Sequence, residues 1–207
     1  DLVQNTTGLV KSREHWWGWL DQPMRKDGLA SLSAFQYIEN FNDHVDYIEG
    51  VAPTDTVVMV NGEATIEVAV FHDRATALQI SVGDVINSQS IDRGTGLVRS
   101  VVTGTFEQTD SSEVFWLQLG EVYLAPAIEG REQPLIMLPT SNSMFTEVAE
   151  ANTGLPASYD WFIYTDQSLL AEKSVAELES AFEGLKLQLE DTIARPFVIT
   201  EMIPRIE

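Results

Sequence analysis

Histidines are the side chains of this sequence best suited to acid–base or metal chemistry, and there are three, His15, His44 and His72. None has a second histidine four residues away in the His-Glu-x-x-His arrangement, which places two zinc ligands on one helix face. We therefore disfavour a zinc hydrolase and interpret the three as surface or packing residues. Neither Gly-x-Ser-x-Gly nor Ser-x-x-Lys is present, so the easily recognised serine hydrolases are excluded, and a serine nucleophile outside such motifs stays open.

Polar side chains, all but one of them bearing oxygen, gather in the segment 40–49. They are Asn40, Asn42, Asp43, His44, Asp46 and Glu49. Such oxygens are calcium ligands, but these lack the Asp-x-Asp-x-Asp-Gly spacing and fall in a segment predicted to be helical, so metal binding is disfavoured. Residues 92–96 contain two glycines without a dinucleotide or P-loop motif, which argues against a nucleotide. We predict no catalytic residue, no metal ligand and no cofactor, and the substrate-binding residues stay unknown.

The charge of the chain excludes several classes of partner. Twelve Lys and Arg residues stand against 32 Asp and Glu residues, which gives a net charge of −20. A surface this negative repels phosphate groups, so nucleic-acid binding and docking to an anionic membrane through a basic patch are nearly excluded. The acids are most simply a solvated face, and a partner protein would be basic. The absence of cysteine excludes a disulfide scaffold and a thiol nucleophile.

Trp16, Trp17 and Trp19 form a dense aromatic cluster. Indole rings suit sugar stacking and membrane interfaces, but they also fill cores. We prefer the interpretation that they pack inside the domain or against a partner.

The 207 residues suffice for one large domain or two small ones. The longest apolar runs, such as 57–60, are far too short to span a bilayer. The chain starts at Asp1 without a signal peptide, and we expect it to be a segment of a longer protein.

Hydrophobic periodicity indicates the elements that would position these residues. We expect residues 1–30 to be irregular with a short helical piece. Ser33 and Gln36 have N-cap and N3 spacing, and a helix is predicted from there to Gly50. Its apolar stripe would consist of Phe35, Ile38, Asn42, Val45 and Ile48.

The middle of the chain is predicted to be mostly β. Asn61-Gly62 lies between β-branched runs at 56–60 and 65–71, which is a strong hairpin signal. A helical turn at 73–78, a turn into a strand at 80–86 and a strand at 97–106 are expected next. Further short strands are predicted at 114–119, 121–124 and 135–138.

The last third is predicted to alternate helix and strand. A helix over 143–152 and a strand over 160–165 come first. Ser174 and Glu177 form a capping box that begins a long amphipathic helix. A final strand is predicted over 197–203.

Several segments carry a familiar order of motifs. In Val68–Ile86 a strand would lead into a short helix and the turn Val82-Gly83-Asp84. Val98–Phe106 ends as Val-x-Gly-x-Phe, and Leu135–Thr140 is an apolar strand followed by Pro and Thr. Asp160–Asp166 precedes the Ser174 helix, and Ile48–Val51 has the form Ile-x-Gly-Val. In these features residues 62–139 and 158–190, and in the first 60 residues only Ile48–Val51, resemble the extracytoplasmic domain of MacB/FtsX-type ABC transporter permeases.

The resemblance implies an α+β fold. A mixed α/β porter-like subdomain would be formed by both chain ends, residues 1–61 plus 140–207, with a small β-rich subdomain inserted at 62–139. Independently of the resemblance, Gly83 suits a turn that needs positive φ and Asp84 is suited to accept hydrogen bonds from nearby backbone amides, so both are interpreted as structural.

The resemblance also implies a function without catalysis. The domain would couple ATP-driven motion of membrane helices to the export or handling of a lipid, peptide, lipoprotein or partner protein. The implied partners are a second permease subunit, a cytoplasmic ATPase subunit and an extracytoplasmic protein or lipid cargo. The implied location is the extracytoplasmic face of the cell membrane, with the parent protein embedded in that membrane.

Two other functions stay open. A secreted or surface module that binds sugar or peptide through the Trp cluster predicts a concave aromatic site away from the chain ends. A hydrolase of unrecognised type predicts a pocket with converging polar groups and at least one ionisable residue whose pKa is strongly perturbed.

Overall fold

The computed structural model describes residues 3–12, 15–19, 32–60, 63–90, 97–116, 136–148, 157–165 and 173–192. The chain divides into two compact units, one formed by Thr7–Phe162 and the other by Asp1–Thr6 together with Ile163–Glu207. The predicted division into an outer subdomain and an insert at 62–139 stays a prediction.

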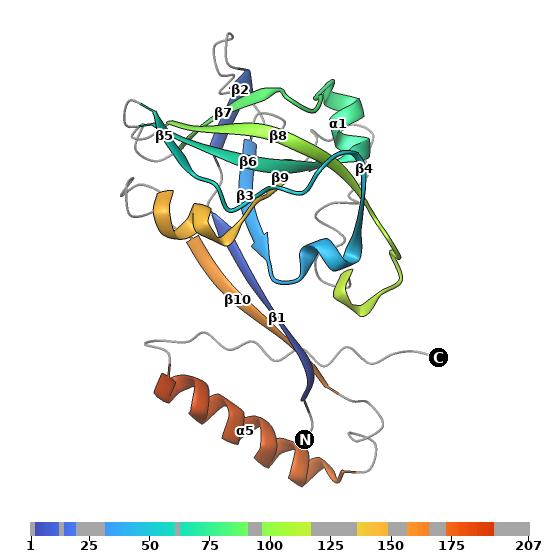
Figure 1. The fold of residues 1–207 in the computed structure, drawn as a ribbon. Coiled ribbons are helices and arrows are strands. Elements are labelled where there is room, and N and C mark those ends of the chain that lie inside the picture. Colours follow the sequence, from blue (N-terminus) through green and yellow to red (C-terminus); the bar gives the residue numbers. More distant parts are fainter. Residues whose placement is uncertain are drawn as a thin grey trace, which may run out of the picture. The chain divides into compact units, whose positions relative to one another are not determined.

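Strands dominate the described residues (Figure 1). The first half contains β1 (Val3–Ser12), β2 (His15–Trp19), β3 (Leu32–Ile38), the 3-10 helix η2 (Phe41–His44), β4 (Val45–Gly50), β5 (Val58–Val60), β6 (Glu63–Phe71) and the helix α1 (His72–Leu78). The second half contains β7 (Val85–Ser90), β8 (Leu97–Gln108), the 3-10 helix η3 (Val114–Trp116), β9 (Ile136–Pro139), the π-helical turn η4 (Met144–Val148), β10 (Ala157–Thr165) and the helix α5 (Val175–Thr192). None of the described helices is long and apolar enough to cross a membrane.

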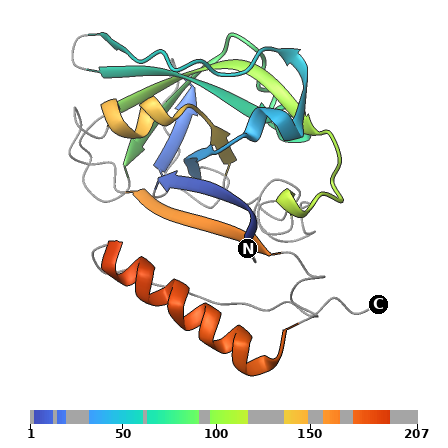
Figure 2. The same ribbon diagram turned by 60° about the horizontal axis from the view of Figure 1, so that its bottom comes forward.

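All ten described strands join one mixed sheet. Its main path runs β10-β1-β3-β2-β7-β8-β6-β5, while β4 pairs with β8 and β9 pairs with β3. Figure 2 shows β1 and β10 side by side, as this order requires. The pairs β6–β8 and β3–β9 are parallel, and the pairs that β2, β4, β5 and β7 form with their neighbours are antiparallel.

The predicted α+β fold class is wrong, because the protein is mostly β. Two of the segments expected to be irregular or helical are strands. Residues 3–12 and 15–19 form β1 and β2, and β2 pairs with β3 on one edge and β7 on the other. The helix predicted over 33–50 is replaced by β3, η2 and β4.

Burial of both faces of β3 explains why its sequence pattern predicts a helix. Successive side chains of a strand point to opposite faces, and here both faces are covered. Phe35 belongs to one hydrophobic cluster, whereas Ala34 and Ile38 belong to a second cluster. A strand buried on both faces lacks the alternation that distinguishes it from a buried helix, so periodicity alone is ambiguous.

Most other local predictions are confirmed. β5 and β6 form the predicted hairpin, with Val60 paired to Glu63, and the turn at 61–62 lies outside the described residues. α1, β7, β8, β9 and β10 occur where a helical turn or strand was expected. The predicted strand at 114–119 is wrong at its start, since Val114–Trp116 is a 3-10 helix.

Other predictions are confirmed only in part or fall on residues that are not described. The helix predicted over 143–152 is a π-helical turn as far as Val148, and 149–152 lie outside the described residues. The loop at 92–96 and the strands predicted at 121–124 and 197–203 also lie outside them.

The capping box of α5 forms as predicted. The Ser174 amide donates to Glu177 Oε2 at 2.9 Å, and the Glu177 amide donates back to Ser174 Oγ at 3.4 Å. The side-chain and backbone hydrogen bonds from Ser174, together with nearby Lys173, lower the pKa of Glu177. These bonds satisfy backbone donors of the first helical turn that have no partner within the helix.

β8 carries the centre of the sheet because three strands pair with it. β6 lies along one edge, while β7 and then β4 share the other edge. Between the β7 and β4 sections, the register against β6 skips Thr103, which is therefore the extra residue of a β-bulge. The Thr103 carbonyl accepts a hydrogen bond from the Val51 amide at 2.9 Å.

Two glycines allow β4 to approach β8 at this bulge. Gly50 has φ +73°, and a Cβ added there would overlap the Thr103 carbonyl oxygen. A Cβ on Gly104 would lie 2.5 Å from the Val51 carbonyl oxygen and 2.8 Å from the Tyr47 ring. Side chains larger than hydrogen are therefore excluded from both positions.

We predict that Gly50→Ala destabilises the fold by about 2–5 kcal/mol, since positive φ strains an alanine and the new methyl group overlaps a backbone carbonyl. Gly83→Ala is the matched control, because Gly83 has φ +94° but nothing lies within 4 Å of an added Cβ. That control should cost about 1–2 kcal/mol from strain alone. Urea unfolding of both variants measures the difference, and equal losses would contradict the close approach.

Tyr47 is the titratable group most affected by this packing. Burial raises its pKa to about 12, and its hydroxyl donates to Asn42 Oδ1 at 2.8 Å. The unfolded chain releases the proton near the ordinary value of 10.0, while the folded chain keeps it. Its contribution to stability is therefore complete below pH 10 and is lost as pH rises from 10 towards 12.

We therefore expect the free energy of unfolding of the wild-type chain to fall more steeply between pH 10 and about 12 than that of Tyr47→Phe, which has no proton to release. Urea unfolding of the two proteins, below and within this window, tests the difference. Parallel pH profiles would show that Tyr47 is not held in its neutral form by the fold.

Candidate functional site

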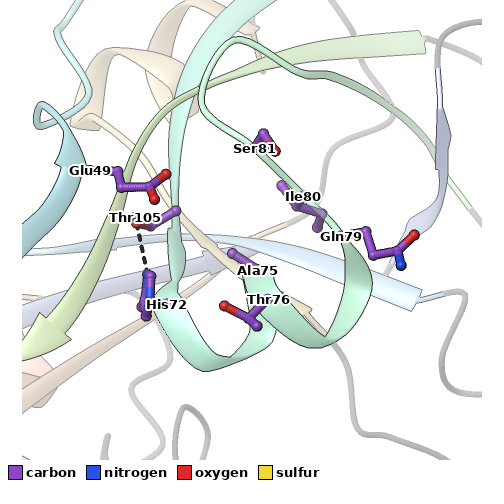
Figure 3. Close-up of a pocket in the computed structure, with 8 residues that line it drawn as sticks. All are labelled: Glu49, His72, Ala75, Thr76, Gln79, Ile80, Ser81 and Thr105. Atoms are coloured by element: carbon purple, nitrogen blue, oxygen red, sulfur yellow. Dashed lines mark hydrogen bonds between the residues drawn. The ribbon is translucent and has the colours of Figure 1, made fainter.

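The candidate site is a hollow of about 240 Å³ beside α1. Four elements contribute to it, namely the end of β4, α1, the turn after α1 and β8 (Figure 3). Its lining residues are Glu49, His72, Ala75, Thr76, Gln79, Ile80, Ser81 and Thr105. The lining therefore combines one carboxylate, one imidazole, three hydroxyls and an amide over two apolar residues.

Sheet register places Glu49 and Thr105 together. The two residues are direct cross-strand partners between β4 and β8, after a bulge at Ile48. Directly opposite residues on antiparallel strands project to the same face, so the Glu49 carboxylate lies next to the Thr105 side chain, as Figure 3 shows. Glu49 is exposed, whereas Thr105 exposes only 2% of its surface.

His72 is held against the floor of the hollow. It is the first residue of α1, directly after β6, and its Nδ1 lies 3.2 Å from Thr105 Oγ1 in a hydrogen bond whose donor depends on the histidine tautomer. β6 is parallel to β8, and Phe71 pairs with Phe106, which brings His72 beside Thr105. The bond thus ties the start of α1 to the centre of the sheet.

A hydroxyl bonded to an imidazole is also the arrangement of a nucleophile and its base. The third group of such a site, a carboxylate bonded to the other ring nitrogen, is missing from the described contacts of His72. Thr105 is also almost fully buried. The geometry therefore favours an anchoring role for the pair.

The end of α1 forms the opposite wall through a Schellman motif. The Ile80 amide donates to the Ala75 carbonyl at 2.8 Å, and the Gln79 amide donates to the Thr76 carbonyl at 3.3 Å. This motif requires a left-handed residue after the helix, usually glycine, and here it is Gln79 with φ 57°. Ile80 and Ala75 are both buried in the same hydrophobic cluster, which completes the motif.

We predict that Gln79→Gly stabilises the fold by up to about 1 kcal/mol, because it removes the cost of a left-handed non-glycine residue. Ala77→Gly is the control, since a glycine inside the helix costs about 1 kcal/mol. Thermal or urea unfolding of both variants measures these changes. A loss of stability in Gln79→Gly would show that the Gln79 side chain stabilises the fold by more than its left-handed backbone costs.

The turn after α1 behaves as the sequence predicted. Gly83 has φ 94°, and the Ser81 amide donates to Asp84 Oδ2 at 2.7 Å. The Gly83 amide and the Asp84 carbonyl bond to Val102 of β8 at 2.8 and 2.9 Å. Gly83 and Asp84 thus fix the turn that carries Ser81 into the hollow.

The oxygen-rich segment 40–49 does not form one site. It is spread over η2 and β4, where Asn42 bonds to Tyr47 and His44 Nδ1 lies 2.6 Å from Glu113 Oε2. Across the described ranges no group of three or more His, Asp or Glu side chains is arranged to hold a metal ion. Only Glu49 of this segment lines the hollow.

The other two histidines pack against aromatic rings. His44 stacks on Phe115 with ring centroids 3.8 Å apart. His15 is 1% exposed and contacts Phe35 at 5.5 Å between ring centroids. Their packing agrees with the interpretation drawn from the sequence.

The tryptophan cluster lies on β2 inside the sheet. Trp17 is buried in the core, and its ring meets Trp19 edge-on at 6.0 Å between centroids. Trp16 and Trp19 are half-buried. None of the three is among the described residues that line the hollow, so these tryptophans form no aromatic platform for a sugar there.

Sequence reasoning missed the hollow itself. Thr105 and Thr76 gave no signal as isolated residues, and Glu49 was assigned to a helix. The pairing of Glu49 with Thr105 depends on β4 being a strand, which only the structure reveals.

Comparisons with known proteins identify no family for this chain. No family model matches the sequence, and no curated protein matches it significantly. Among solved structures, the chain is similar to a domain of a presumed permease from Porphyromonas gingivalis, with 14% identity and a TM-score of 0.43 over 91% of this chain and 71% of that one. A similarity this low carries no argument about the function of this chain.

Proposed function

We propose that this chain is the extracytoplasmic domain of an ABC transporter permease of the MacB/FtsX type, without catalytic activity of its own. It couples ATP-driven motion of membrane helices to the export or handling of a lipid, peptide, lipoprotein or partner protein. Its partners in this role are a second permease subunit and a cytoplasmic ATPase subunit.

The observation that carries the proposal is the order of elements from β6 to β8. The sequence resemblance to such permeases requires a strand, a short helix, a Val-Gly-Asp turn and two strands in this segment. The chain has β6, α1, the turn at Val82–Asp84, β7 and β8 in that order. The turn also has the positive φ at Gly83 and the Asp84–amide bond expected from its sequence.

A coupling domain must transmit motion, and the packing of the described residues in the unit Thr7–Phe162 supports this role. Two buried clusters cover both faces of β3 and extend over β6 and β8. Domains of this kind transmit motion by moving as packed bodies and not by bending. The net charge of −20 favours a basic partner outside the membrane.

Membrane attachment tests the proposal on the full-length gene product. We expect it to stay with the membrane fraction after a carbonate wash and to purify in detergent together with ATP hydrolysis. Release into the soluble fraction would contradict the permease and favour the secreted binding module.

The side of the membrane is tested with engineered thiols, because this chain has no cysteine. Thr109→Cys introduces a thiol at an exposed position, and Val68→Cys places one where the side chain is fully buried. A membrane-impermeant maleimide should label the first variant in intact cells, and the second only after denaturation. Labelling of Thr109→Cys only after cell lysis would place the domain in the cytoplasm.

A further inference from the structure

We propose that the hollow beside α1 binds the side chain of a lysine from a basic protein segment. The Glu49 carboxylate receives the ammonium group, and Ala75 and Ile80 contact the methylene stem. This inference goes beyond the proposed function and does not depend on it, because it rests on the hollow alone.

The charge of the lining selects a cation. Among the described residues of the lining, Glu49 is the only acidic one and none is Lys or Arg. Within the described part of the chain, no amide, hydroxyl or cation bonds to the Glu49 carboxylate. Arg74, the one basic residue besides histidine on α1, is not part of the lining. The surrounding net charge of −20 adds a long-range attraction for the same sign.

The remaining polar groups match an ammonium. A lysine ammonium has three donors and no acceptor, so it needs several oxygens around it. The hydroxyls of Thr76, Ser81 and Thr105 line the hollow with the Glu49 carboxylate. When Thr105 donates its proton to His72 Nδ1, its oxygen is still open to accept from a ligand.

The volume and the lining of the hollow indicate that it binds one side chain. About 240 Å³ lies below the roughly 300–1,000 Å³ of pockets that enclose drug-sized ligands. Ala75 and Ile80 are 2% and 5% exposed, so they form an apolar floor that already belongs to the core. Lysine combines a charged head with an apolar stem, which is the distribution this lining presents.

Hydrogen bonds hold the backbone that forms the walls of the hollow. The Schellman motif fixes the end of α1, and the His72–Thr105 bond fixes its start. The Gly83 and Asp84 bonds to Val102 fix the turn that carries Ser81. The backbone around an entering lysine is therefore already held by hydrogen bonds, which lowers the part of the entropic cost of binding that comes from ordering the backbone.

The test is an NMR titration of the whole chain with acetyl-Gly-Lys-Gly-amide. We expect saturable shifts of the amides of Glu49, Gln79 and Ser81. The same peptide with norleucine keeps the stem but has no charge, and it should give no saturable shift at equal concentration. Shifts spread over the acidic surface without saturation at these amides would overturn the proposal, and so would equal binding of the norleucine peptide.

Glu49→Gln should weaken binding of the lysine peptide about tenfold, the loss expected for one charge-assisted hydrogen bond. Glu107→Gln is the matched control, because Glu107 is exposed on β8 outside the lining and the charge change is the same. It should change the affinity less than twofold if only general attraction is reduced. If the two substitutions weakened peptide binding equally, the interaction would be non-specific electrostatic attraction, and the proposed site would be wrong.

The two variants should unfold at the wild-type temperature, because both carboxylates are exposed. The titration also separates this inference from the proposed function. A permease domain that fails to bind the peptide would still label from outside the cell, and a soluble protein that binds it would still show the site.

Discussion

The close approach of β4 to β8 at the Thr103 bulge is the constraint on which the centre of the sheet depends. The same edge of β8 pairs with β7 as far as Val101 and with β4 from Gly104 onward. The bulge supplies the bend, and the hydrogen atoms of Gly50 and Gly104 supply the space. Without them, Glu49 would not lie opposite Thr105, and the hollow would lose its carboxylate.

The hollow owes its polar lining to the same arrangement. β6 ends beside Phe106 on one edge of β8, and β4 pairs Glu49 with Thr105 on the other edge, so His72 and Glu49 meet near the C-terminal end of β8. The short helix α1 then caps this end. Groups held by strands on both sides of β8 are positioned more firmly than groups on a free loop.

Turn and cap residues in the sequence predict those elements whose contacts lie within a few residues along the chain. The hairpin of β5 and β6, the short helix α1 and the Gly83 turn all depend on contacts within a few residues, and their turn and cap residues are visible in the sequence. The α5 capping box belongs to the same class.

The first third of the chain could not be predicted in this way. β1, β2 and β3 are strands because of partners that come later in the chain, such as β7 for β2 and β9 for β3. Buried polar residues obscured the pattern further. Gln36 is 2% exposed, and Ser12 Oγ accepts a hydrogen bond from the Phe35 amide at 2.9 Å. The candidate site could not be predicted from local sequence for the same reason, since Glu49 lies on a strand whose partner is more than fifty residues away.

The pairing of β1 with β10 has a consequence for how the chain reaches this fold. The Lys11 carbonyl accepts a hydrogen bond from the Ser158 hydroxyl across 147 residues, so the first described strand pairs with the last described strand. The block from β5 to β8 is continuous in sequence and closes its loops at lower entropic cost. This block can therefore assemble early, while β3 waits for β9 and β1 waits for β10. Such waiting strands expose unpaired backbone groups and apolar side chains, and the net charge of −20 supplies a repulsion that opposes their pairing between molecules.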